Sequence, residues 1–171
     1  PGQSLALFRR DLDRVLALAP DHLSLYTLAV EDKTQFAKRK VVADDGLGRE
    51  MMEHAARALA AEGFRHYEIS NFARPGQESL HNINYWLDGD YIGLGCGAAG
   101  HLDGERWQNE ERLAKYFTLI EEGKRPLAGA ERLSGKEKLG ERMLLRLRLI
   151  DGFSLTADMQ TSTTGSQPLG L

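Results

Sequence analysis

Segments with helical periodicity alternate with strand-like segments in the first half of the chain, and this alternation is the strongest constraint on its fold. Residues 4–19 and 45–62 place apolar side chains at helical spacing, and the two segments end at a proline and a glycine. Residues 22–30 follow the first helix and residues 64–69 follow the second, both with the composition of strands. Helices that alternate with strands are typical of a parallel α/β sheet. Since the first strand is apolar almost throughout, we expect it to be buried on both faces.

The second half continues with shorter elements. Residues 91–94 begin a third strand, and a turn at Asp103-Gly104 predicts a hairpin that returns through residues 105–108. A helix over residues 109–122, capped by Asn109, follows. A capping box of Ser134 and Glu137 begins a last helix that reaches about Ile150; its arginines 142, 146 and 148 are expected on a solvated face. Three strands are too few for a closed barrel, so further strands must come from elsewhere.

Composition excludes several classes of protein. The 171 residues carry a net charge of −3, which does not suggest a nucleic-acid partner. No apolar run approaches the roughly 18 residues of a membrane helix, and no signal peptide is visible. The single cysteine, Cys96, rules out an internal disulfide, indicates a reducing compartment such as the cytoplasm, and is too little for an iron–sulfur cluster. Residues 156–171 lose apolar periodicity, and we interpret the chain as a fragment with a frayed or foreign tail.

A glycine-rich turn spans residues 93–100, and residues 95–100 match the G-x-G-x-x-G pattern of dinucleotide-binding proteins. That fingerprint requires a helix directly after the turn, whereas His101 here leads into a second turn. A glycine turn that brings the backbone against some other ligand is the better interpretation, and a structural bulge is equally compatible with the sequence.

His81, Asn82, Tyr85 and Trp86 form a short motif that combines a candidate ligand with large aromatic side chains. An imidazole beside aromatic rings suits a flat aromatic ligand such as a porphyrin, either by axial ligation or by stacking. The alternative is a capped helical turn with Tyr85 and Trp86 in the core, and the residues alone do not decide between the two.

Polar residues Glu68, Ser70 and Asn71 lie at the end of the second predicted strand. In a barrel-like sheet that end would be the functional face. Alternatively, Asn71 caps the next turn and Glu68 pairs with a nearby arginine, either Arg65 or Arg74.

Together these segments resemble a known family. The resemblance rests on the opening Pro-Gly-Gln, the strand from His22 to Glu31, Tyr-Glu-Ile-Ser-Asn-Phe at 67–72, His-Asn-x-x-Tyr-Trp at 81–86 and Gly-Leu-Gly-Cys-Gly-Ala at 93–98. They occur in this order in the radical SAM heme chaperone (HemW) family, also described as oxygen-independent coproporphyrinogen III oxidase-like. The resemblance covers roughly residues 1–153.

The resemblance implies the C-terminal part of a longer protein. Residues 1–108 would be the later part of a partial (β/α)6 radical SAM barrel, residues 109–153 the start of a C-terminal helical region, and residues 154–171 a disordered or non-native tail. The family's CxxxCxxC motif is absent here. The 4Fe–4S cluster and S-adenosylmethionine would therefore belong to the whole protein, with the missing N-terminal half of the barrel as a partner of this chain.

The resemblance also implies roles for individual residues. Thr27 and Ala99 would line the S-adenosylmethionine site, largely through backbone or apolar contacts. His81, Asn82, Tyr85 and Trp86 would bind heme, with His81 as a candidate axial ligand.

Three functions follow as hypotheses. The first is a cytoplasmic heme chaperone that passes heme to an acceptor protein. The second is a coproporphyrinogen oxidase that decarboxylates propionates to vinyls by radical chemistry, against which the HNxxYW motif argues. The third is an interaction module without catalysis. This chain alone is not expected to be active, and we expect an exposed strand edge beside Tyr26 to favour homodimers.

Overall fold

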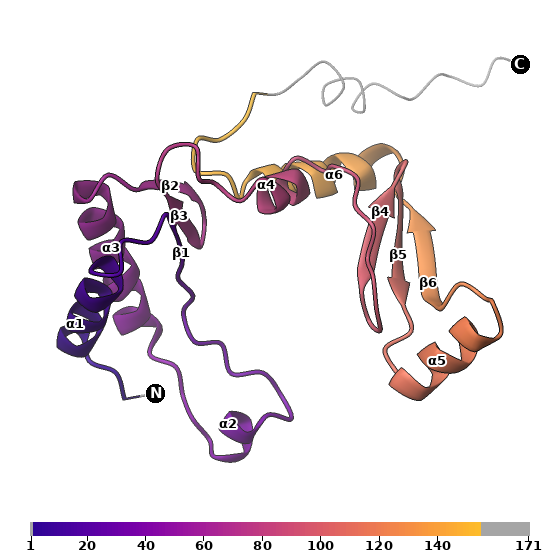
Figure 1. The fold of residues 1–171 in the computed structure, drawn as a ribbon, viewed down its shortest axis with the longest axis horizontal. Helices are drawn as coiled ribbons and strands as arrows, with labels where there is room; N and C mark the ends of the chain where they lie inside the picture. The colour runs from indigo at the N-terminus through magenta and orange to yellow at the C-terminus, as the bar shows by residue number, and fades with distance from the viewer. Residues whose placement is uncertain (1, 155–171) are drawn as a thin grey trace, which may run out of the picture. The chain divides into compact units, whose positions relative to one another are not determined.

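The computed structural model describes residues 2–154, which form two compact units, residues 2–78 and residues 79–154 (Figure 1). The chain is a mixed α/β protein, as predicted. The predicted tail lies outside the described residues except for Ser154. The boundary expected at residue 108, between the barrel part and a C-terminal helical region, stays a prediction.

The first unit packs two helices against a small sheet. It contains α1 (Leu5–Leu16), β1 (His22–Ser24), the short α2 (Gln35–Lys38), α3 (Asp45–Ala61), β2 (Arg65–Glu68) and β3 (Asn71–Ala73). Both long helices begin at the predicted positions, because Ser4 and Asp44 accept hydrogen bonds from the first-turn amides of Leu7 and Leu47. The core joins α1, α3 and β3 through the buried residues Leu12, Ala55, Leu59, Phe64 and Phe72.

The sheet of the first unit differs from the predicted parallel one. Its order is β1-β3-β2, and both hydrogen-bonded pairs are antiparallel. Strands β1 and β2 run in the same direction, as predicted, but β3 lies between them. The sequence analysis missed β3 because it follows β2 after only the two residues Ile69 and Ser70, in a segment interpreted as a polar strand end.

The first strand is also shorter than predicted. Regular pairing ends at Ser24, and the amide of Leu25 donates to the carbonyl of Ser70 at 2.8 Å. No strand within residues 2–154 pairs with residues 26–30, and Tyr26 is exposed. The apolar sequence of this segment favours burial, but the described chain provides no strand to pair with it.

The second unit combines a three-stranded antiparallel sheet with helices. Its elements are α4 (Leu80–Trp86), β4 (Ala99–Leu102), β5 (Glu105–Asn109), α5 (Leu113–Glu121), β6 (Leu127–Arg132) and α6 (Gly135–Arg146), with sheet order β4-β5-β6. The predicted hairpin around Asp103-Gly104 is confirmed. Helix α4 packs against α6.

Several boundaries in this unit were predicted wrongly. Residues 91–94 are not a strand, and only Tyr91 forms a bridge, to His101. Asn109 ends β5 and does not cap α5, whose N-cap is Arg112. Helix α6 begins after Ser134 as predicted, but its N-cap has no side-chain hydrogen bond, so the capping box does not form. It ends at Arg146 and not near Ile150, so Arg148 lies in the turn that follows the helix. Strand β6 was not predicted.

Candidate functional site

Helix α4 presents the aromatic motif. Its N-cap Ser79 accepts a hydrogen bond from the amide of Asn82. His81 and Tyr85 are one turn apart and therefore share a face, with ring centroids 4.5 Å apart. His81 is exposed, whereas Tyr85 and Trp86 are half-buried. The motif is thus a capped helix, but its aromatic rings are not core residues.

The turn after α4 directs the chain back toward the site. Asp88 ends the helix with a φ of 63°, in the left-handed region. The Asn84 amide donates to the carbonyl of Asp90 at 3.0 Å, and its side chain occupies the space that a Cβ at Gly89 would need. Asn84, which the sequence analysis did not single out, therefore requires glycine at position 89.

The glycine-rich turn is a compact loop tied to β5. A Cβ at Gly93 would collide with the carbonyl of Ala99, and Gly95 has a φ of 103°. The Asn109 side chain donates to the carbonyls of Gly93 and Gly95, at 3.3 and 2.9 Å. Strand β4 follows this turn, not a helix, so the arrangement lacks the phosphate-binding helix of a dinucleotide fold.

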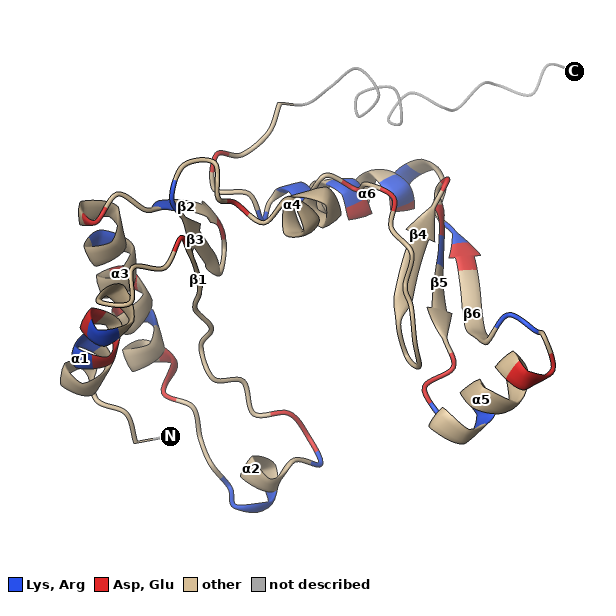
Figure 2. Ribbon diagram, in the orientation of Figure 1, with Lys and Arg blue, Asp and Glu red and all other residues tan. Residues whose placement is uncertain are grey.

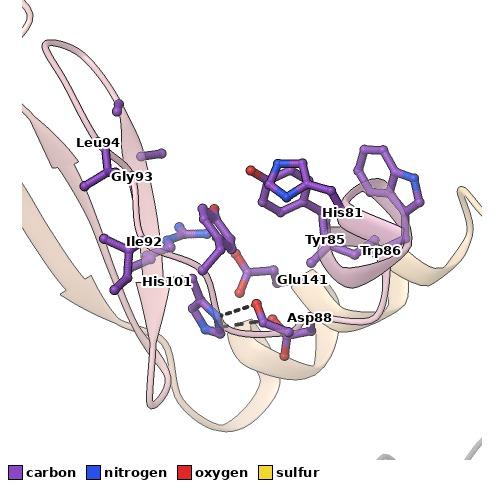
Figure 3. A pocket seen from close by; sticks show the side chains of 15 residues that line it. His81, Tyr85, Trp86, Asp88, Ile92, Gly93, Leu94, His101 and Glu141 are labelled. Carbon is purple, nitrogen blue, oxygen red and sulfur yellow. Dashed lines mark hydrogen bonds and ion pairs between the residues drawn. The ribbon is translucent and has the colours of Figure 1, made fainter. Parts of the chain in front are cut away.

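These two segments form opposite walls of one cavity of about 630 Å³. Figure 3 shows His81, Tyr85 and Trp86 on one side, Ile92, Gly93 and Leu94 on the other, and His101, Asp88 and Glu141 between them. The lining also includes Gly89, Tyr91, Ala98, Ala99, Arg106 and Leu145. The volume is within the range of roughly 300–1,000 Å³ that is typical of small-molecule sites.

A hydrogen-bonded ionic network forms the polar side of the cavity. The buried His101 has Nδ1 at 3.2 Å from the carbonyl of Gly89 and Nε2 at 3.9 Å from Asp88. Lys138 of α6 donates to Asp88 at 2.8 Å and to Glu141 at 3.2 Å. Both nitrogens of His101 thus face protein groups, so His101 is a structural residue of this wall.

Tyr91 extends the aromatic lining from α4 toward His101. Its ring lies 4.4 Å from that of Tyr85 in an edge-to-face arrangement. Burial raises the pKa of the Tyr91 hydroxyl above its ordinary value of 10, and the nearby Tyr85 and Glu141 add to the effect. Tyr91 is therefore a neutral hydrogen-bonding group near pH 7.

The structure brings together four of the residues predicted as site residues. His81, Tyr85, Trp86 and Ala99 line the cavity, whereas Asn82 is not among its lining residues. Thr27 belongs to the first unit, where its methyl group is 3.3 Å from the position that a Cβ on Gly48 would take. Thr27 also lines a separate cavity of about 670 Å³ beside α3.

Sequence reasoning missed much of the cavity wall. Asp88, Tyr91, Arg106, Glu141 and Leu145 were not singled out. The spacing of Glu141 and Leu145, one helical turn apart on α6, was the signal that could have found that face.

The polar strand end at Glu68 and Asn71 forms the turn between β2 and β3. Glu68 is 1% exposed, and its carboxylate accepts a hydrogen bond from the amide of Ser70 at 2.8 Å. Asn71 is 2% exposed, and its Oδ1 has no partner among the described residues. The Glu68 carboxylate thus closes the hairpin turn, and neither residue lines the aromatic cavity.

The prediction of a solvated arginine face on α6 was wrong. The guanidinium carbon of Arg148 is 4.2 Å from the centroid of the Trp86 ring, and Arg142 Nε is 3.7 Å from Asp88 Oδ2. Arg142 and Arg146 of α6, and Arg148 in the turn after it, are all half-buried. Basic and acidic residues are interspersed along α6 (Figure 2), so their composition resembles a solvated helix and did not reveal this packing.

Comparison with known proteins agrees with the resemblance seen in the sequence. Over 157 residues the chain is 37% identical to the heme chaperone HemW of Lactococcus lactis. This alignment covers 89% of this chain and 41% of the L. lactis protein. HemW of Bacillus subtilis is 36% identical over 159 residues, and this alignment covers 90% of this chain and 42% of that HemW. This chain is a homologue of part of the HemW heme chaperones. It spans about 40% of the length of these HemW relatives. No protein-family profile matches the chain.

A solved structure extends the HemW homology to the fold. Coproporphyrinogen III oxidase (HemN) from Escherichia coli, a radical SAM enzyme, superposes with a TM-score of 0.72 at 21% identity, covering 86% of this chain and 38% of HemN. The chain therefore shares the fold of part of that enzyme.

The chain's own residues do not suit the iron–sulfur cluster of this family. Its only cysteine, Cys96, donates to the carbonyls of Glu110 and Glu111, and residues 2–154 contain no group of three metal-ligating side chains. No helix in that range is long and apolar enough to cross a membrane.

Proposed function

We propose that this chain carries the heme-binding region of a cytoplasmic HemW-type heme chaperone and represents the later part of a partial (β/α)6 radical SAM barrel. The observation that carries the proposal is the single cavity formed by the HNxxYW helix and the glycine-rich turn. The homology to proteins named heme chaperones supports the same function.

The cavity suits a porphyrin in size and chemistry. Tyr85, Trp86 and Tyr91 provide aromatic surface for the flat ring, and Ile92 and Leu94 provide apolar surface opposite. His81 is exposed at the cavity and hydrogen-bonds to no other described residue, so its imidazole is free to ligate iron. Heme, when bound, would supply the metal, and the chain would orient it and shield it from water.

The family's cofactors would lie with the rest of the protein. We propose Thr27 and Ala99 for the S-adenosylmethionine side and Asn82 as a support of the heme-binding helix. A 4Fe–4S cluster would need cysteines that this chain does not contain. The partners would then be the N-terminal half of the barrel and a heme-acceptor protein.

A heme titration of the 171-residue chain tests the proposal. We expect a Soret shift for the wild type, its loss or displacement for His81→Ala, and an unchanged shift for His54→Ala, which removes an imidazole from α3 of the other unit. Heme also adheres nonspecifically to apolar surface, so His81 dependence is the informative result. Equal spectra for His81→Ala and the wild type would exclude the ligand assignment.

The fold shared with HemN supports a second candidate, an oxidase that decarboxylates coproporphyrinogen III. The full-length protein with a reconstituted cluster distinguishes the two. Turnover of coproporphyrinogen III would favour the oxidase, and His81-dependent heme binding without turnover would favour the chaperone. Absence of both would leave an interaction module.

A further inference from the structure

Helix α6 and the turn that follows it bring arginines close to α4, the helix that carries the heme motif. Glu141 and Leu145 of α6 line the aromatic cavity, and the guanidinium of Arg148, two residues after the end of α6, lies over the ring of Trp86 at 4.2 Å. Trp86 therefore belongs both to the cavity wall and to the arginine contact.

Several hydrogen-bond donors in the region around Trp86 and these arginines, called the arginine seam below, lack acceptors. The Nε atoms of Arg142, Arg146 and Arg148 and the Nε1 atom of Trp86 are buried and have no hydrogen-bond partner among the described residues. Arg142 at least lies near the Asp88 carboxylate. The Nε atoms of Arg146 and Arg148 have no hydrogen-bond acceptor within residues 2–154. Because a guanidinium stays charged and buried donors are normally paired, this seam suits an incoming anion.

We propose that Arg146 and Arg148, with Trp86 Nε1, bind the carboxylates of the porphyrin, an inference that rests on the proposed heme function. A heme consists of a flat apolar ring and two propionate side chains. The His81–Tyr85–Trp86 face suits the ring, and guanidinium groups bind carboxylates through paired charge-assisted hydrogen bonds. Trp86 contacts one face of the Arg148 guanidinium and does not use the N–H groups at its edge, which can therefore still donate to an acceptor.

A simpler role for these arginines is stabilisation of the C-terminal end of α6, where positive side chains interact favourably with the helix dipole. That role makes no distinction between ligands with and without carboxylates. Esterified heme therefore separates the two roles.

The test compares iron(III) protoporphyrin IX with its dimethyl ester, each titrated into the 171-residue chain. We expect the wild type to bind the diacid about tenfold or more tightly than the diester, the scale of one charge-assisted hydrogen bond. In the variant with both Arg146→Gln and Arg148→Gln, the affinity for the diacid should fall by about tenfold, and the affinity for the diester should change little. Lys136→Gln, which removes a positive charge from the exposed first turn of the same helix, should behave as the wild type.

The outcomes separate the inference from the proposed function. His81-dependent binding with equal affinity for diacid and diester would overturn the arginine assignment and leave the heme function standing. Binding that depends neither on His81 nor on the carboxylates would be nonspecific adhesion and would exclude the heme function. A diacid preference that the arginine variant abolishes would support the carboxylate site in either case. If the double glutamine variant does not fold, Arg146→Lys and Arg148→Lys keep the charge and should still reduce the diacid preference, because lysine lacks the planar fork.

Discussion

Gly100 of β4 lies directly opposite Trp107 of β5, and the Trp107 indole fills the space that a Cβ at residue 100 would need. The tryptophan thus covers the bare backbone of the glycine across the hairpin. This pair joins the glycine-rich turn to the sheet and so positions one wall of the cavity.

Gly100→Ala should therefore destabilise the protein, by about 1–3 kcal/mol, because the indole must move from a packed position. Urea unfolding followed by circular dichroism measures the change. Gly129→Ala is the matched control, since Gly129 lies in β6 of the same sheet and an added Cβ there meets nothing within 4 Å. Equal losses of unfolding free energy in the two variants would show that the Gly100–Trp107 contact does not exclude a side chain at residue 100.

Glu110 should make stability depend on pH in the acid range. Hydrogen bonds from Arg112 and Lys115 lower the pKa of its carboxyl from 4.5 to about 2. Because the folded-state pKa is depressed, the ionised group contributes stability above about pH 4.5, and this contribution is lost as pH falls toward 2. Unfolding free energies measured between pH 2 and 6 should show a smaller acid loss for Glu110→Gln than for the wild type.

The exposed Glu121 of α5 provides the control for that measurement. Glu121→Gln should leave the wild-type acid dependence unchanged. An identical pH profile for Glu110→Gln and the wild type would contradict the role of Glu110.

Asp88 should be important for the packing of α4 on α6. Its carboxylate, 12% exposed, accepts a hydrogen bond from Lys138 and lies near Arg142 and His101. Asp88→Asn should cost about 2 kcal/mol, since it removes the negative charge from a half-buried cluster of cations. Asparagine tolerates the left-handed backbone at this position, so the loss reports the charge.

A double-mutant cycle with Lys138→Met measures the Asp88–Lys138 interaction by urea unfolding. The two substitutions should be less costly together than the sum of the single effects. Additive effects would mean that Asp88 acts without Lys138.

The unpaired edge beside β1 should lead to self-association. Strand β1 is at the edge of its sheet, and Tyr26 and Val42 are exposed, at 74% and 86%. We expect the apparent mass in light scattering to rise with concentration, and Tyr26→Lys to reduce the rise by adding charge at the edge. A monomer at all concentrations would rule out this expectation.

Local patterns were enough to predict the features that depend on neighbouring residues. The helices α1 and α3 follow from apolar periodicity with a capping residue, and the β4–β5 hairpin follows from Asp103-Gly104. The HNxxYW and glycine-rich motifs also identified the family and two walls of the site. Each of these signals lies within a short stretch of chain.

Tertiary structure alone decided which segments meet. Strand β3 lies between β1 and β2 because a two-residue turn reverses the chain at Ile69 and Ser70, and this makes the sheet antiparallel. The cavity unites α4 with the glycine turn, and α6 adds Glu141 and Leu145 from a later part of the chain. Arg142, Arg146 and Arg148 look solvated in sequence because charge content does not reveal which face of a segment is packed, and the contact of Arg148 with Trp86 appears only in the tertiary structure.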